Sequence, residues 1–199
     1  MNDAQTYQFD LCGGHLALDF ANTVSNRHTD EPTERLARWD DVVSFAEQTS
    51  LISRAAGRRL RAWGQEDPRR GERLRKEVVE LREALYAIFA AVAEERRPAP
   101  EDLTVLNAWL RELKLGAALD WEWGEGPDAP TAFVAPILRA AVDLATGRER
   151  ARVRMCEASD CVWLFLDASK NRSRRWCDMN QCGNREKARR FHERAKGER

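Results

Sequence analysis

The sequence predicts an α+β protein in two parts. A mainly α-helical N-terminal domain with a small β component spans residues 1–147, and a small module of a β-hairpin and a helix spans residues 148–199. Apolar residues recur every three or four positions through most of the first part. Four of the five cysteines lie in the second. The charges also differ: residues 148–199 carry 15 Lys and Arg against 8 Asp and Glu, and residues 1–147 carry 18 against 25. Two modules with different partners are therefore expected.

The elements of the N-terminal part follow from spacing and from turn residues. Gly13-Gly14 marks a turn, and the next apolar residues predict a short helix. The same periodicity predicts helices over 16–24, 40–46, 55–63, 72–96, 101–113 and 133–146. Residues 119–123 alternate between apolar and acidic side chains before a glycine- and proline-rich turn, which predicts a strand.

The C-terminal cysteines form two matched pairs, Cys156 with Cys161 and Cys177 with Cys182. Each pair has four residues between its members. In a reducing compartment, clustered pairs of this kind indicate metal ligands. Four thiolates suit one tetrahedral Zn²⁺ and leave no position for a catalytic water. We therefore expect one structural zinc ion per chain, the alternative being four free or disulfide-paired thiols.

The segments between and after these pairs predict a treble-clef-like zinc finger. Val162–Leu166 is a β-prone apolar run, residues 168–171 resemble a turn, and residues 172–176 lead back to the second pair. Residues 184–196 have the spacing of an amphipathic helix. A knuckle, a hairpin and a helix with the last ligand at its start are thus expected.

Two motifs resemble a known family. The tetrapeptide Cys182-Gly183-Asn184-Arg185, with FLDAS and RRWC before it, resembles the CGNR zinc finger, and GGHLALDFANTV at residues 13–24 resembles the start of the ABATE domain that usually precedes it. The resemblance covers nearly the whole chain. It implies a stress-response transcription regulator whose finger binds DNA.

Cations around the cysteines favour the same partner. A basic hairpin and helix can neutralise phosphates, and arginine on a helix can bind guanine edges. The expected DNA-binding residues are Arg172, Arg174, Arg175, Arg185, Lys187, Arg189 and Arg190. The alternative is a solvated helix face on a finger that is purely structural or that contacts protein.

The N-terminal domain carries polar residues inside an apolar run. Asp19, Asn22 and Thr23 interrupt LALDFANTV. Asn22 and Thr23 serve as local backbone caps, or these polar residues line a pocket. On the second interpretation, Asp19, Asn22 and Arg27 bind a small-molecule effector. A further hypothesis is a homodimer formed through the helix over residues 72–96.

Other classes of protein are disfavoured. No Ser/His/Asp motif, phosphate-binding loop or catalytic zinc motif is visible, so no enzymatic activity is expected. No apolar run approaches a membrane span, and the N-terminus lacks the features of a signal peptide. We therefore expect a soluble, cytoplasmic protein.

Overall fold

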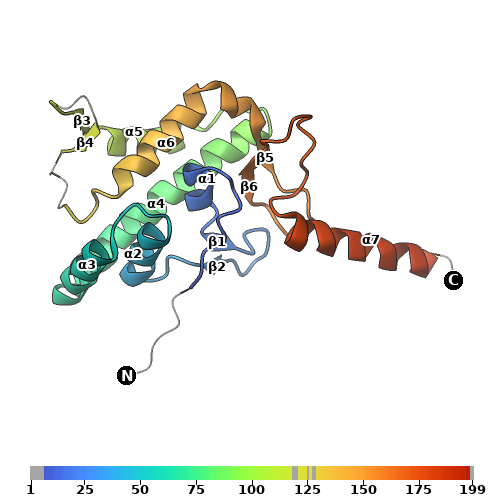
Figure 1. Ribbon diagram of the computed structural model, residues 1–199, viewed down its shortest axis with the longest axis horizontal. Coiled ribbons are helices and arrows are strands. Elements are labelled where there is room, and N and C mark those ends of the chain that lie inside the picture. Colours follow the sequence, from blue (N-terminus) through green and yellow to red (C-terminus); the bar gives the residue numbers. More distant parts are fainter. Residues whose placement is uncertain (1–6, 118–120, 125, 127–128, 198–199) are drawn as a thin grey trace.

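The computed structural model describes residues 7–117, 121–124, 126 and 129–197, and within them it shows seven α-helices and three antiparallel pairs of short strands (Figure 1). The helices are α1 (Leu16–Ala21), α2 (Trp39–Gln48), α3 (Arg54–Glu66), α4 (Pro68–Ala93), α5 (Pro100–Leu110), α6 (Val134–Thr146) and α7 (Asn184–Gly197). The strands are β1 (Val24–Ser25), β2 (Thr33–Glu34), β3 (Leu113–Leu115), β4 (Trp121–Trp123), β5 (Val153–Met155) and β6 (Leu164–Leu166). The fold class predicted from the sequence is confirmed.

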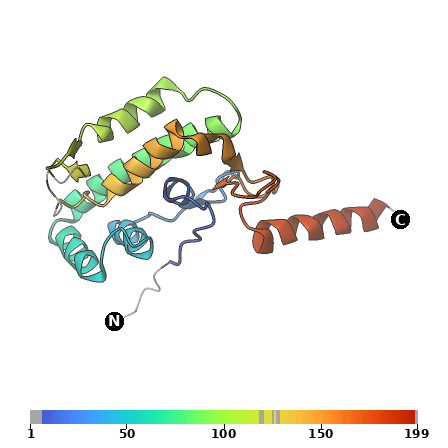
Figure 2. The same ribbon diagram turned by 45° about the horizontal axis from the view of Figure 1, so that its top comes forward.

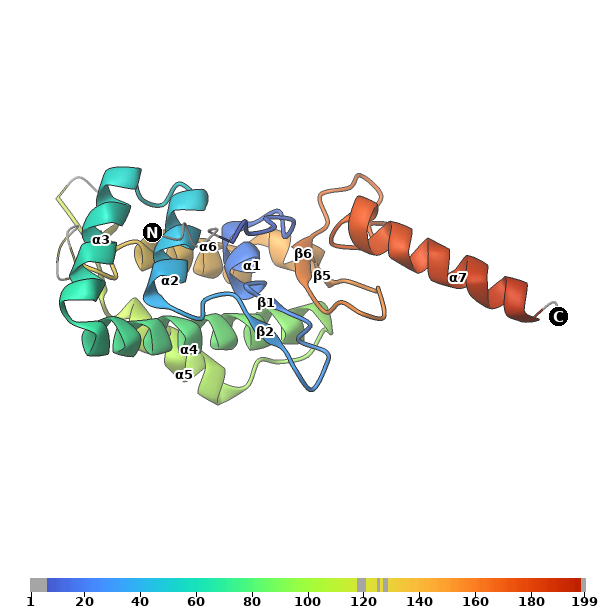
Figure 3. The same ribbon diagram turned by 90° about the horizontal axis from the view of Figure 1, so that it is seen from below.

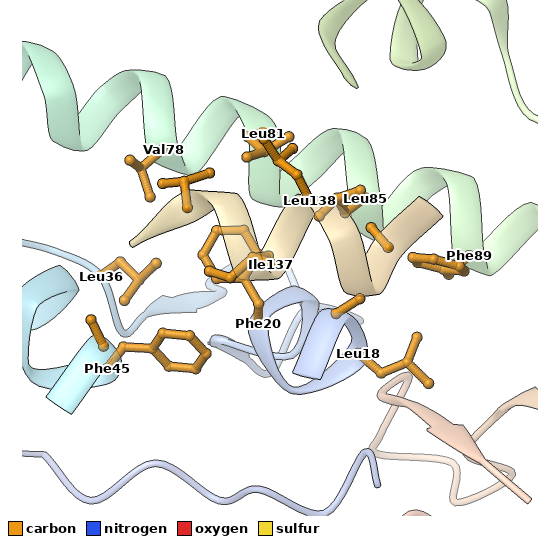
Figure 4. Packing of buried hydrophobic residues seen from close by; sticks show 14 of the residues in the cluster. Leu18, Phe20, Leu36, Phe45, Val78, Leu81, Leu85, Phe89, Ile137 and Leu138 are labelled. Atoms are coloured by element: carbon orange, nitrogen blue, oxygen red, sulfur yellow. The ribbon is translucent and has the colours of Figure 1, made fainter. Parts of the chain in front are cut away.

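The short helix α1 lies at the centre of the hydrophobic core. Its apolar side chains are buried against α4 and α6. Figure 4 shows Phe20 of α1 beside Ile137 of α6, and its ring centroid is 5.6 Å from that of Phe45. The apolar stripe of α4, including Val78, Leu81 and Leu85, is buried in the same core. That stripe is therefore used within the chain.

Some element boundaries differ from the prediction for local reasons. α4 begins at Pro68, earlier than expected, because proline is favoured in the first turn of a helix and the Asp67 side chain accepts a hydrogen bond from the backbone N–H of Arg70 (3.1 Å). α1 ends at Ala21, because the Asn22 side chain bonds elsewhere. The predicted strand at 119–123 is present as β4, which pairs with β3; Leu119 and Asp120 lie outside the described residues.

The predicted hairpin pairs differently from expectation. β6 forms as predicted, but its partner is β5, with Val153 opposite Leu166, rather than residues 172–176. The turn of this hairpin is the segment that holds the first cysteine pair. Residues 172–176 return as a loop without strand pairing. The predicted turn is present, with the Arg172 N–H donating to the Ser169 carbonyl (3.3 Å), but the reversal between the paired strands is made by the first cysteine knuckle.

The hairpin of the finger enters the core of the helical part, while the cysteines form a second buried cluster with Ala158 and Phe165. Val153, Leu164 and Leu166 of the hairpin belong to the same buried cluster as α1, α4 and α6. α7 is the exception: its contacts are mainly with the turn that precedes it. In Figures 1, 2 and 3 it projects away from the rest of the molecule.

Candidate metal centre and basic helix

The four predicted ligands converge on one point. The Sγ atoms of Cys156, Cys161, Cys177 and Cys182 all lie within 4.8 Å of one another. Cys177 Sγ is 3.7 Å from Cys161 Sγ and 3.5 Å from Cys182 Sγ. A tetrahedral Zn²⁺ with bonds of about 2.3 Å to sulfur requires separations of about 3.8 Å. The cluster therefore fits one zinc ion.

Electrostatics at the cluster also favours a cation. Hydrogen bonds from Cys161 and Cys177 hold the pKa of the Cys156 thiol well below its usual value. The hydrogen bond with Cys156 raises the pKa of Cys161, and contacts with the thiols of Cys12 and Cys156 raise that of Cys177. Four thiolates at this spacing repel one another, so a bound cation is needed for all four to ionise.

Backbone geometry delivers the second pair of cysteines. The Asp178 side chain accepts hydrogen bonds from the backbone N–H groups of Asn180 (2.6 Å) and Gln181 (3.0 Å) and caps a π-helical turn, Met179–Gly183. Cys182 lies in that turn, immediately before α7. The last ligand thus stands at the helix N-terminus, where the helix dipole favours a negative sulfur.

Comparison with protein families agrees with this geometry. The ABATE model, described as "Putative stress-induced transcription regulator", matches residues 14–148, and the CGNR zinc finger model matches residues 152–195. The chain belongs to the ABATE family. No curated protein matches it. The resemblance noted in the sequence is confirmed, and one structural Zn²⁺ is the cofactor of its CGNR finger.

The ABATE motif LDFANTV makes structural contacts. Asn22 is buried and holds β6: its Nδ2 donates to the carbonyl of Leu164 (2.8 Å), and its Oδ1 accepts from the N–H of Leu164 (2.9 Å). Thr23 Oγ1 donates to the carbonyl of Phe20 and accepts from the buried Arg82. Both side chains are therefore buried and bonded within the protein.

The other two expected effector residues are also engaged. Asp19 accepts a hydrogen bond from the N–H of Gly13 (2.8 Å), and burial raises the pKa of its carboxyl group to about 6. Arg27 pairs with Glu83, and its guanidinium lies 3.9 Å from the ring centroid of Tyr86. The structure does not bring Asp19, Asn22 and Arg27 together around one cavity.

A cavity of about 260 Å³ lies at the seam between the ABATE domain and the finger. Arg27 and His28 line it from one side, and Cys161 and Arg185 from the other. Asp19 and Asn22 do not line it. Of the three expected effector residues, Arg27 alone lines this cavity.

The predicted DNA-binding cations separate into two groups. In the first, Arg174 is turned inward: it donates to the carbonyls of Cys12 (3.0 Å), Trp176 (3.0 Å) and Cys177, and its guanidinium lies over the Phe165 ring. These contacts hold the loop that carries the second cysteine pair, so the Arg174 guanidinium is engaged within the finger.

Asp160 also holds two of the predicted cations. Arg185 contacts both of its carboxylate oxygens at 2.9 Å, and Arg189 contacts one at 3.2 Å. The hydrogen bond from Arg185 lowers the pKa of the Asp160 carboxyl group. Arg185 also approaches Cys182 Sγ at 3.4 Å. The arginine of the CGNR tetrapeptide thus fixes α7 to the first knuckle.

The second group faces solvent. Lys187 and Arg172 are exposed and form no ion pair with any described residue, and the same holds for the neighbouring Lys170, which is not among the predicted residues. Arg190 is half-exposed and pairs with Glu186 at 3.4 Å, and Arg175 pairs with Glu157 at 2.6 Å. These five cations, hereafter the outward cations, remain available to an anionic partner.

Two residues near the metal centre escaped the sequence analysis. Cys12 is half-buried and packs against the four-cysteine cluster. Asp160 was not singled out, although it anchors two arginines. Both contacts join segments far apart in the chain, so no local pattern indicated them.

Within the described residues, no helix combines the length and apolar character that crossing a bilayer requires.

Proposed function

We propose that this ABATE protein is a DNA-binding transcription regulator whose finger docks on a duplex through α7 and the loop before it. The observation that carries the proposal is the position of α7. It projects from the body, anchored at its N-terminus beside the zinc cluster, and bears six Lys and Arg against two Glu (Figure 1). An isolated helix of this length is marginally stable in water, so a partner would stabilise it.

The dimensions suit a major groove. A helix of 14 residues is about 21 Å long, and the groove is about 12 Å wide. Lys187 and Arg190 would contact phosphates or base edges from the helix, and Arg172 would contact phosphate from the loop. Arg185 and Arg189 would act indirectly, because their contacts with Asp160 set the direction of α7.

The experiment is a titration of labelled random-sequence duplex with the zinc-loaded full-length protein, followed by fluorescence anisotropy. We expect binding at about 50 mM salt that weakens steeply by about 200 mM. The double variant Lys187→Gln/Arg190→Gln should reduce the salt dependence by about two phosphate contacts. Arg58→Gln, an exposed cation on α3, is the matched control and should bind as the wild type does. Absence of binding at the lower salt concentration overturns the proposal.

A second candidate is a protein-interaction module. Phe191 on α7 is 70% exposed, beside His192, and an apolar ring in this position would suit a protein groove. A zinc-loaded protein that ignores duplex DNA at low salt, and whose binding to a protein partner is lost in Phe191→Ser, would favour this function.

For the ABATE domain we propose a sensing role, with neither a catalytic nor a dimerising one. Zinc with four thiolate ligands offers no open position to a substrate. The helix over residues 72–96, named above as a possible homodimer contact, corresponds to α4, and its apolar stripe is buried within the chain. The proposal includes a small-molecule effector that binds in a cavity of the domain.

A further inference from the structure

A cleft lies between α4, α5 and β4, in the half of the molecule away from α7 (Figures 1 and 2). Its volume is about 350 Å³, near the lower end for small-molecule pockets. Glu77 and Glu80 line it from α4, Trp109 from α5 and Trp123 from β4. Glu112 and Thr131 complete the chemically distinctive part of the lining.

The charge of the lining has one sign. Glu77, Glu80 and Glu112 are exposed, and none of them forms an ion pair with another described residue. No Lys or Arg lines the cleft. Arg73 and Lys76, one turn away on α4, line an adjoining groove that also includes Glu77 and Glu80, and Lys76 pairs with Glu72. The lining of the cleft itself nevertheless carries three carboxylates and no cation.

Two indole rings form an aromatic wall. The ring centroids of Trp109 and Trp123 are 5.9 Å apart, with 41° between the ring planes. The face of an indole ring attracts cations, and more strongly where water is excluded. An ammonium group can therefore pair with the acidic side chains and also lie against the faces of the indole rings.

One buried polar group in the lining lacks a protein partner. Trp123 is 5% exposed, and its Nε1–H meets no acceptor among the described residues. Unsatisfied buried donors are rare in native proteins. Thr131, which is 7% exposed, adds a hydroxyl group to the same lining. A ligand that also carries an oxygen acceptor would satisfy the indole N–H.

The carboxylates do not form a metal site. Within the part of the chain that the structure describes, the four cysteines are the only group of His, Cys, Asp or Glu whose ligand atoms lie close enough to share an ion. A divalent metal would need its oxygens closer together than these. The ligand whose charge matches this cleft is consequently an extended organic cation rather than a metal ion.

We propose that this cleft binds a small organic cation: an ammonium group with a nearby hydroxyl or carbonyl oxygen. The ammonium lies against the indole rings and is neutralised by Glu77 and Glu80, and the oxygen faces Trp123 and Thr131. The site does not depend on DNA binding by the finger, so either proposal can fail alone.

Choline is a suitable probe, and 3,3-dimethylbutan-1-ol is its neutral counterpart of nearly the same shape. Each is titrated into the zinc-loaded full-length protein labelled with ¹⁵N, and the indole N–H resonances are followed by NMR. We expect saturable shifts of the Trp109 and Trp123 indole signals with choline, and binding of the neutral alcohol at least about tenfold weaker.

Variants assign the effect to the cleft. The double variant Glu77→Gln/Glu80→Gln should weaken choline binding by about tenfold or more while the remaining spectrum is retained. Glu66→Gln, an exposed residue at the end of α3, is the matched control and should leave binding unchanged. Equal binding of choline and the neutral alcohol, or unchanged binding in the double variant, overturns the proposal.

Discussion

At the scale of single residues, the Asn22 side chain makes the two hydrogen bonds that a neighbouring strand would offer to Leu164. The amide joins segments 142 residues apart and is 3% exposed. A side chain that both donates and accepts is needed here, because Leu164 presents an N–H and a carbonyl in the same place. This explains an asparagine inside an otherwise apolar motif.

Replacing this residue should be costly. Asn22→Ala leaves the buried N–H and carbonyl of Leu164 without partners, and we expect a loss of about 2–4 kcal/mol in the free energy of unfolding. Urea denaturation followed by circular dichroism measures it. Asn107→Ala, an exposed asparagine on α5, should change stability by less than about 0.5 kcal/mol. Equal effects of the two substitutions would contradict the assigned role of Asn22.

The sequence identified Asn22 and Thr23 as unusual but could not choose between a cap and a pocket. Thr23 bonds locally to the carbonyl of Phe20, as a cap does, and also meets Arg82 on α4. The partner of Asn22 lies in another module. Residue type and spacing reveal local partners, whereas the distant ones depend on how the chain is folded.

At the scale of elements, α7 takes its direction from one carboxylate. Asp160 lies on the first cysteine knuckle and holds Arg185 and Arg189 of the helix. Apart from this clamp, α7 contacts mainly the turn before it. The same clamp neutralises part of the positive charge that was predicted from the sequence to bind DNA. The outward cations are not part of the clamp and remain for a partner.

Asp160→Asn tests this clamp. Partly exposed ion pairs contribute little to global stability, so we expect a loss below about 1 kcal/mol in the free energy of unfolding. Local opening of α7 should nevertheless increase, which speeds amide hydrogen exchange at residues 186–190. Asp30→Asn, an exposed aspartate in the β1–β2 loop, serves as the control. Unaltered exchange in Asp160→Asn would show that α7 is held by other contacts.

Helices were the more predictable elements. The stripe of α4 and the helical spacing of α7 were visible in the sequence, since neighbours three and four apart determine a helix face. The sequence analysis paired β6 with residues 172–176, whereas its partner is β5. β6 has apolar residues on both faces, so no alternation of apolar and polar residues indicates its register, and strand pairing depends on residues distant in the chain. The zinc ligands needed no such information, as their spacing alone indicated a tetrahedral site.

At the scale of the whole molecule, zinc should stabilise more than the finger. The ion is held in part by Cys156 and Cys161, in the turn between β5 and β6, and Val153, Leu164 and Leu166 of these strands enter the core of the helical part. Burial of three such side chains is worth roughly 5–9 kcal/mol. The charge difference between residues 1–147 and 148–199 predicted two modules, but no charge pattern could show that they share an interior.

Chelation of zinc is therefore expected to lower the thermal stability of the α-helical signal as a whole, and zinc should restore it. Circular dichroism at 222 nm during heating, with and without a chelator, measures this change. By elemental analysis, Cys12→Ser should retain one zinc per chain and Cys182→Ser should lose it. A helical transition that is indifferent to chelation would contradict the coupling.

The shared core has a consequence for how such proteins can diversify. A finger whose apolar residues all pack within the finger itself can be exchanged between proteins as an independent unit. This one cannot, because β6 completes the interior of its host and Asn22 is shaped to receive it. Recombination at residue 148 would leave both fragments with exposed apolar surface, so domain and finger are expected to be inherited as a pair.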